Sequence, residues 1–149
     1  MPLQESFRGP GKSFIDRYRE ILTRLRFRPT GPGEGSAHHR VMRPQGLCLP
    51  IISMGVRVAV DKANVITDAR ISMGPVGPVP YLAEPAMDVL IGGPAEANQY
   101  EKAAEVALQN VELRARKYRA TREYREQMVR TFLPVILERA VQRARQGLS

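Results

Sequence analysis

The chain has 149 residues, enough for one domain, and carries a formal net charge of +8 that favours an anionic partner such as nucleic acid, a phosphate group or an acidic subunit. Its single cysteine, Cys48, excludes an internal disulfide and favours a reducing compartment. The N-terminus lacks the apolar core of a secretory signal, and the longest apolar run, 47–56, is too short to span a membrane, so we expect a soluble, cytoplasmic protein.

The first third of the chain is predicted to be linker, one strand and loop. Residues 1–13 contain the sequence GPG and are expected to be a linker. In the stretch 20–28, two apolar residues alternate with three arginines, which favours a strand that ends at Pro29 over a helix across 16–25. A flexible loop is expected over 29–35. An extended segment over 36–43 and a short turn or helical piece over 44–50 complete this part.

The stretch 51–80 begins with two segments of alternating apolar residues, a pattern typical of half-buried strands. Between them, residues 61–64 (DKAN) have turn chemistry, so the two segments are predicted to form a hairpin. Arg57 and Asp68 are expected to face each other across the two strands as a favourable pair. The predicted register joins Val60 with Val65, Val58 with Thr67, Val56 with Ala69 and Met54 with Ile71 on one apolar face.

Three helices are predicted after the segment 74–80, whose prolines exclude a helix or a central strand. The first begins at Glu84 and ends before 92–94, and the second runs from Ala97 to about residue 113. The third has Thr121 as its N-cap, ends at Gly147 and should be kinked by Pro134. Its predicted apolar face consists of Tyr124, Met128, Val129, Phe132, Leu133, Ile136, Leu137, Ala140 and Ala144.

Sequence signatures of catalysis and of metal binding are absent. The chain has no P-loop and no GxGxxG between a strand and a helix, and its glycine-rich stretch 31–35 lacks that setting. His38 and His39 are the only histidines, and as neighbours in an extended segment they should point to opposite faces, which disfavours a shared metal. We predict no catalytic residue and no metal ligand. The simplest interpretation of the two histidines is that both are polar residues that face solvent.

Basic residues gather between the last two predicted helices and are the best nucleic-acid candidates in the chain. They are Arg114, Arg116, Lys117, Arg119, Arg122 and Arg125. Tyr118 and Tyr124 lie among them and could stack on bases. Three glutamates interleave with the cluster and no known DNA- or RNA-reading motif is present, which favours a solvated helix junction or a subunit-facing surface.

Several ordered motifs resemble the C-terminal domain of the FAD-binding (medium) subunit of molybdenum hydroxylases, the carbon monoxide dehydrogenase and xanthine dehydrogenase family. One is Gly74-x-Val76-x-Pro78-x-Pro80 after the strand ITDARI, followed by a short helix that ends Leu90-Ile91-Gly92. Residues 117–128, beginning Lys-Tyr-Arg-Ala-Thr, are similar to the closing segment of that family. Residues 7–12 and 20–23 resemble its entry from the flavin domain, and 43–46 with 49–51 a variant of some members.

This resemblance implies an α+β fold, a small antiparallel sheet of about three strands packed against a three-helix bundle, over residues 14–149. It also implies that residues 1–13 are the linker from a missing FAD-binding domain. That N-terminal domain would carry two glycine-rich loops, and FAD would be bound only together with it. In relatives, an aromatic residue and a basic residue after the loop lie against the flavin and its phosphates. His38 stands at the aromatic position and His39 or Arg40 at the basic one, so these three are the expected cofactor-binding residues.

The sequence therefore predicts a domain that helps to close an FAD site and to dock subunits in a molybdenum/iron–sulfur/flavin hydroxylase. The redox chemistry would belong to the cofactors, so the chain should be inactive alone. The resemblance implies three partners: the FAD-binding domain, the molybdopterin large subunit and the iron–sulfur small subunit. Two alternatives stay open, a basic nucleic-acid-binding module and a stand-alone interaction domain that has lost flavin binding.

Overall fold

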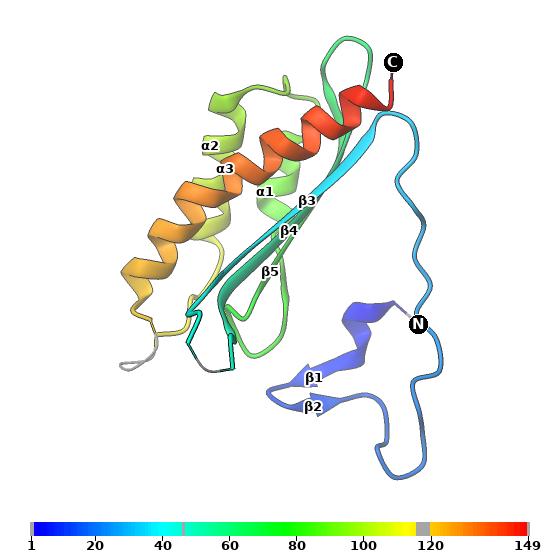
Figure 1. The fold of residues 1–149 in the computed structure, drawn as a ribbon, viewed down its shortest axis with the longest axis vertical. Coiled ribbons are helices and arrows are strands. Elements are labelled where there is room, and N and C mark those ends of the chain that lie inside the picture. Colours follow the sequence, from blue (N-terminus) through cyan, green and yellow to red (C-terminus); the bar gives the residue numbers. More distant parts are fainter. Residues whose placement is uncertain (1, 46, 116–119, 149) are drawn as a thin grey trace.

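Residues 2–45, 47–115 and 120–148 are described by a computed structural model of the chain (Figure 1). Its main sheet has four antiparallel strands in the order β3-β4-β5-β6, with bounds Glu34–Met42, Pro50–Val60, Ile66–Gly74 and Tyr81–Leu82. Two helices, α1 (Glu84–Leu90) and α3 (Arg122–Gln146), pack on one face of this sheet, and α2 (Ala97–Gln109) packs against both of them. The predicted α+β class is confirmed, with four strands in the main sheet where about three were expected.

The N-terminal part lies apart from the main sheet (Figure 1). It contains the short 3₁₀ helix η1 (Leu3–Ser6) and a two-stranded hairpin of β1 (Phe7–Gly9) and β2 (Lys12–Ser13). The strand predicted over 20–28 is wrong, because the structure assigns no strand there and residues 20–30 have no ladder partner. The division into a linker of 1–13 and a domain of 14–149 stays a prediction.

The β4–β5 hairpin has the predicted turn but a different register. Asp61 Oδ1 accepts hydrogen bonds from the amides of Ala63 and Val65, both at 2.9 Å, and Asn64 has a left-handed φ of 63°. Met54, Val56 and Val58 pair with Met73, Ile71 and Ala69, two residues further along β5 than predicted. An irregularity at Ala59/Val60 then pairs Val60 with Ile66, so Ile66 is buried and Thr67 is exposed, against the prediction.

Apart from Val65 and Thr67, which lie beyond the irregularity, the predicted core face of the hairpin is confirmed despite the register error. A shift of two residues keeps every side chain on its own side of the sheet, since side chains alternate with period two. The buried hydrophobic residues of β3, β4 and β5 are Ala37, Ile51, Ile52, Met54, Val56, Val58, Val60, Ile66, Ala69, Ile71 and Met73. All of them except Ile51 belong to one core cluster that continues into the helices.

Helix α3 begins and ends as predicted and continues through Pro134. The Thr121 hydroxyl accepts a hydrogen bond from the amide of Tyr124 at 3.2 Å, and Gly147 is the C-cap. Most of its predicted apolar face is buried, but Tyr124 is exposed, and Arg125 and Val141 are buried instead. Helix α2 ends at Gln109, four residues before the predicted end, although Val111 and Leu113 beyond it remain buried.

Strand β3 crosses α3 at very short range. A Cβ placed on Gly35 would lie 2.0 Å from the carbonyl oxygen of Ala140 and 2.6 Å from the amide nitrogen of Ala144. Only glycine fits between these two backbones, so Gly35, Ala140 and Ala144 set the distance between the helix and the sheet. This close packing positions the whole of β3, including its two histidines.

Candidate functional site

The face of the main sheet that is turned away from the helices, here called the open face, carries small, polar and charged side chains. Side chains alternate along a strand, so the residues between the buried ones point to this side. In order along β3, β4 and β5 they are Ser36, His38, Arg40, Ser53, Gly55, Arg57, Asp68, Arg70 and Ser72. Each of them is exposed or half-buried, so the structure leaves them accessible.

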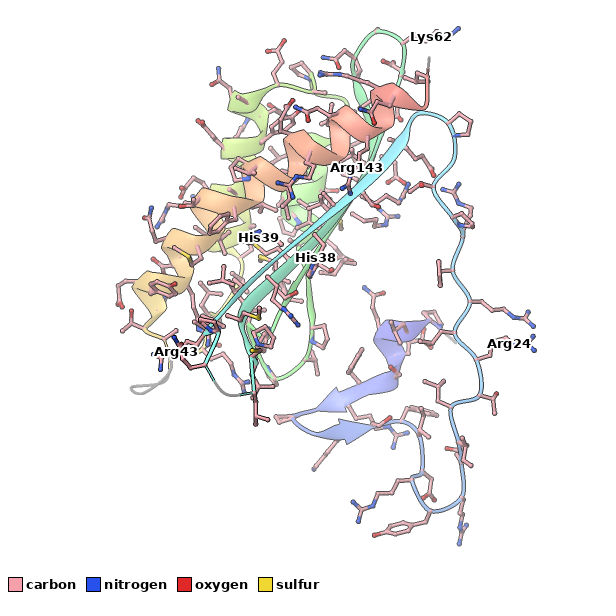
Figure 2. All side chains as sticks on the ribbon, viewed as in Figure 1. Arg24, His38, His39, Arg43, Lys62 and Arg143 are labelled. Carbon is pink, nitrogen blue, oxygen red and sulfur yellow. The ribbon has the colours of Figure 1, made fainter. Side chains whose placement is uncertain are left out.

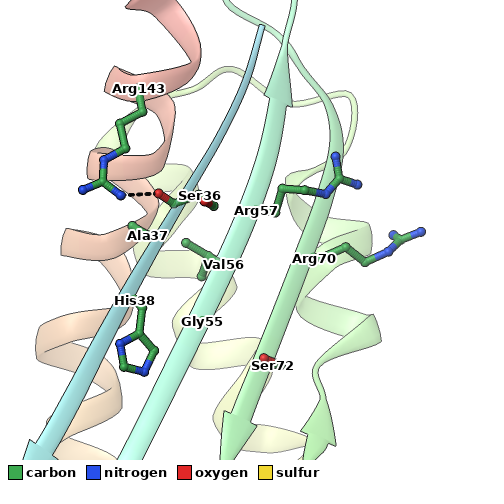
Figure 3. Close-up of a pocket in the computed structure, with 9 residues that line it drawn as sticks. All are labelled: Ser36, Ala37, His38, Gly55, Val56, Arg57, Arg70, Ser72 and Arg143. Carbon is green, nitrogen blue, oxygen red and sulfur yellow. Dashed lines mark hydrogen bonds between the residues drawn. The ribbon is translucent and has the colours of Figure 1, made fainter. Parts of the chain in front are cut away.

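Gly55 gives the centre of the open face a flat floor. A Cβ on Gly55 would meet only the hydroxyl of Ser72, at 3.5 Å, and would otherwise stand in open space. Beside it, the Nε2 atom of His38 shares a hydrogen bond of 2.8 Å with the Ser53 hydroxyl. A hollow of about 380 Å³ lies over this floor (Figure 3), and its lining residues are Ser36, Ala37, His38, Gly55, Val56, Arg57, Arg70, Ser72 and Arg143.

A chain of ion pairs crosses one end of the open face. Arg57 contacts Glu34 Oε1 at 3.1 Å and also pairs with Asp68, which in turn contacts Arg70 at 3.2 Å. Glu34 additionally accepts from Arg28, and the hydrogen bonds from Arg28 and from the Gly31 amide lower its pKa to about 2. The predicted pairing of Arg57 with Asp68 is therefore confirmed, although it is diagonal because Arg70 lies directly opposite Arg57.

Arg143 of α3 reaches over the edge of β3 to the same hollow. Its Nη1 donates to the carbonyl oxygen of Ser36 at 2.5 Å (Figure 3). Together with Arg57 and Arg70 it places three guanidinium groups at this end, where Glu34 and Asp68 are the two carboxylates of the ion-pair chain. Guanidinium groups suit phosphate and carboxylate oxygens, so this end of the open face favours an anionic group.

A second hollow of about 480 Å³ adjoins the first and shares His38, Gly55 and Ser72 with it. Its outer wall is the loop between β5 and β6. The further lining residues are Pro50, Ser53, Met73, Gly74, Pro75, Gly77, Pro78, Val79, Pro80 and Arg114. We call the two hollows together the open-face groove. One end is cationic, and the other is mostly apolar with Arg114 beside it.

The three expected cofactor residues do not share one face of the sheet. His38 and Arg40 lie on the open face, whereas His39 points to the helices (Figure 2) and stacks on Phe132, with ring centroids 4.0 Å apart and an interplanar angle of 21°. Burial lowers the pKa of His39, and the positive charge of Arg139 lowers it further. The prediction that the two histidines point to opposite faces is confirmed.

The predicted basic cluster does not form one exposed surface. Arg125 is only 2% exposed and donates to the carbonyl oxygens of Ile51 and Pro75, the latter at 3.1 Å, so its guanidinium is not available to a phosphate. Arg122 contacts Glu126 at 2.8 Å. Arg116, Lys117 and Arg119, with Tyr118, lie outside the described residues. The sequence signal for burying Arg125 is its spacing of four from Val129, which places it on the apolar side of α3.

Other residues of the groove are not among the predicted site residues. Ser53, Gly55 and Ser72 could be found as the positions that alternate with apolar ones in the two strands. Arg143 could not, because only the packing of α3 on β3 brings it to Ser36.

Among the described residues, no three His, Cys, Asp or Glu side chains gather as metal ligands. In the same part of the chain, no helix is both long and apolar enough to cross a bilayer.

Comparison with known protein families decides the assignment. Residues 37–140, about 70% of the chain, match the family described as the CO dehydrogenase flavoprotein C-terminal domain. The chain belongs to this family. The matched region contains β4, β5, all three helices up to Ala140 and every residue of the open-face groove except Ser36 and Arg143. Comparison of the sequence with curated proteins finds no match.

Solved structures support the CO dehydrogenase flavoprotein assignment. CO dehydrogenase from Oligotropha carboxidovorans is 27% identical with a TM-score of 0.73, over 97% of this chain and 48% of that chain. A structure of Cu,Mo-CO dehydrogenase in its cyanide-inactivated form gives the same values. Quinoline 2-oxidoreductase from Pseudomonas putida 86 shares the fold at 21% identity and a TM-score of 0.66, over 76% of this chain and 39% of that one. The chain therefore spans about half or less of the solved chains that it matches.

Proposed function

We propose that this chain is the C-terminal domain of the FAD-binding subunit of a molybdenum/iron–sulfur/flavin hydroxylase, and that its open-face groove helps to close the FAD site. The observation that carries the proposal is the accessible groove beside His38, on the face of the sheet that no helix covers. Family membership over residues 37–140 supports it, as does the likeness to CO dehydrogenase at 27% identity.

The groove fits the chemistry of FAD. A flavin nucleotide has a flat ring system with polar edges, hydroxyl groups and anionic phosphates. The glycine floor accepts a flat group without steric conflict, since a Cβ at Gly55 would project into the space above it. Serine hydroxyls and the imidazole of His38 can hydrogen-bond to ring edges or hydroxyl groups. The guanidinium groups of Arg57, Arg70 and Arg143 suit phosphate oxygens.

Within this proposal, His38 and Arg40 are the cofactor-facing residues of β3. Both side chains point to the open face, and Arg40 is exposed. His39, stacked on Phe132, would support the site by packing β3 on α3. FAD, when bound, would supply the redox chemistry by taking up electrons and passing them to an external acceptor. The chain itself would bind, orient and shield.

The proposal includes partners for this domain. The flavin would need a second wall, which we assign to an FAD-binding domain on another part of the protein or on another chain. The molybdopterin large subunit and the iron–sulfur small subunit would dock on the assembled flavoprotein. The formal charge of +8 supports contact with acidic surfaces, because complementary charge speeds association and fixes orientation.

The test is retention of FAD through gel filtration. The chain alone should elute colourless. Co-expressed with the portion of the Oligotropha carboxidovorans flavoprotein that lies outside the match, it should give a complex that retains FAD. His38→Ala and Arg40→Ala should each lower that retention, whereas Lys62→Ala, in the β4–β5 turn far from the groove (Figure 2), should leave it unchanged. Stoichiometric FAD on the chain alone, or full retention in both the His38 and the Arg40 variant, would refute the proposal.

A further inference from the structure

Residues 21–28 form an extended, exposed segment whose backbone lacks partners within the described part of the chain. No amide or carbonyl group of residues 21–30 takes part in a hydrogen bond with another described residue. Figure 1 shows the segment running outside the sheet and the helices, and Figure 2 shows Arg24 pointing away from both. A row of free backbone donors and acceptors is a template for strand pairing.

The side chains of this segment have the pattern of a strand. One parity holds Ile21, Thr23, Leu25 and Phe27, and the other holds Leu22, Arg24, Arg26 and Arg28. Leu25 is 60% exposed and Phe27 is 87% exposed, so the described chain leaves most of the surface of these two apolar residues uncovered. An alternating segment with an exposed apolar side and an unpaired backbone is typical of a surface that binds another protein.

We propose that residues 21–28 add as a strand to an open sheet edge of a partner protein that presents an apolar groove on one face and acidic side chains on the other. Leu25 and Phe27 would enter the apolar groove, and Arg24 and Arg26 would meet the carboxylates. Main-chain hydrogen bonds give affinity in this mode of recognition, and alternate side chains give specificity. The inference rests on the proposed function for its partner, the FAD-binding domain.

Charge argues against a second copy of this chain as the occupant. If two copies of the segment paired antiparallel about Leu25 or Arg26, residues of equal parity would face each other. Arg24 would then lie opposite Arg26 or Arg28 of the other copy. Like charges directly opposite each other destabilise a sheet, so a partner with acidic residues at these positions is favoured.

Two further observations fit a partner domain at this place. A hollow of about 560 Å³ lies beside the segment, lined by Pro2, Leu3, Ser6, Ile15, Leu22, Thr23, Arg24, Leu25 and Arg26, and could receive side chains from the partner. The match to the CO dehydrogenase chain covers 97% of this chain, yet only 48% of the CO dehydrogenase chain. The unmatched half of that chain is long enough to contain a complete domain with a sheet.

The test measures amide hydrogen exchange at residues 21–28, first in the chain alone and then in the complex with the unmatched portion of the Oligotropha carboxidovorans flavoprotein. We expect rapid exchange in the chain alone and at least about tenfold slower exchange in the complex. The double variant Leu25→Asp/Phe27→Asp should weaken the complex by about tenfold or more, since it would place two charges in an apolar groove. The matched control is Leu47→Asp/Leu49→Asp, at two exposed leucines between β3 and β4, which should not weaken it.

Failure of this inference and failure of the proposed function give different results. Slow exchange at 21–28 in a complex that does not retain FAD would uphold strand addition and refute the FAD proposal. A complex that retains FAD while residues 21–28 exchange rapidly would uphold the FAD proposal and refute strand addition. Absence of any complex, or equal weakening by the two double variants, would overturn the strand-addition proposal.

Discussion

The crossing of β3 and α3 at Gly35 allows a sharp test of the fold, because a single methyl group should disrupt it. In the variant Gly35→Ala, the new Cβ would lie 2.0 Å from the Ala140 oxygen and 2.6 Å from the Ala144 nitrogen. Both neighbours are backbone atoms of a long helix, so no side chain can rotate away. An ordinary contact needs about 3.5 Å, so helix and strand would have to separate by more than about 1 Å.

The expected loss of stability follows from overpacking. Forcing extra methylenes into a well-packed core typically costs about 1–3 kcal/mol, and more where the backbone must move. For Gly35→Ala we expect the upper end, about 3 kcal/mol or more, which is a large part of the ~5–15 kcal/mol that keeps a domain folded. At about 2–4 °C for each kcal/mol in a domain of this size, Tm should fall by about 6–12 °C.

Gly55→Ala is the matched control, on a neighbouring strand of the same sheet. Its Cβ would point to the open face and meet only the Ser72 hydroxyl at 3.5 Å, an ordinary contact. Alanine in a strand is favoured over glycine by about 0.5–1 kcal/mol, so stability should stay the same or rise slightly. Urea unfolding of both variants, followed by circular dichroism, measures the difference. Equal midpoints for Gly35→Ala and Gly55→Ala would refute the assignment of the two faces and the close crossing.

Three further predictions concern stability and one concerns binding. Val58→Asp buries an unpaired charge at a fully buried site and should lower the free energy of unfolding in urea by several kcal/mol. Arg57→Ala loses only partly exposed ion pairs and should lower it by under ~1 kcal/mol. Equal losses in the two variants would mean that the faces of the hairpin are reversed. The pKa of His39 is lowered in the folded state, so its contribution to stability is present above pH ~6.5 and is lost as pH falls below that value. The free energy of unfolding of His39→Phe should therefore depend less on pH between about 7.5 and 5.5. The same pH dependence in the variant and the wild type would contradict the lowered pKa. Arg125→Met removes the donor for two carbonyl oxygens and should lower the free energy of unfolding by about 1–3 kcal/mol. Arg125→Lys should recover only part of this stability. A methionine variant as stable as the wild type would show that the two hydrogen bonds are dispensable. Duplex DNA or RNA should bind weakly and without sequence preference, and its affinity should fall steeply between ~50 and ~200 mM salt. A filter-binding titration measures this. Sub-micromolar, sequence-dependent binding at the higher salt would favour the nucleic-acid alternative.

Much of the candidate site could be predicted from local pattern. The extended segment with His38, its separation from His39 and the polar side of the hairpin all follow from the alternation of side chains along a strand. The resemblance to molybdenum hydroxylase flavoproteins rests on short ordered motifs and agrees with the family match over residues 37–140. What pattern could not show is that Arg143, 107 residues after Ser36, closes one end of the hollow.

Alternation and helical spacing by themselves determined which faces are apolar, where the last helix begins and where the hairpin turns, because these depend on neighbours within a few residues. Only the tertiary structure decided the register, since a shift of two residues leaves the alternation unchanged and the irregularity at Ala59/Val60 depends on how β4 and β5 meet. It also decided the fate of residues 20–28, which have a strand pattern but no strand beside them in the described chain. A strand needs a partner for its backbone, and whether one is present is a property of the whole assembly, which a local pattern cannot contain.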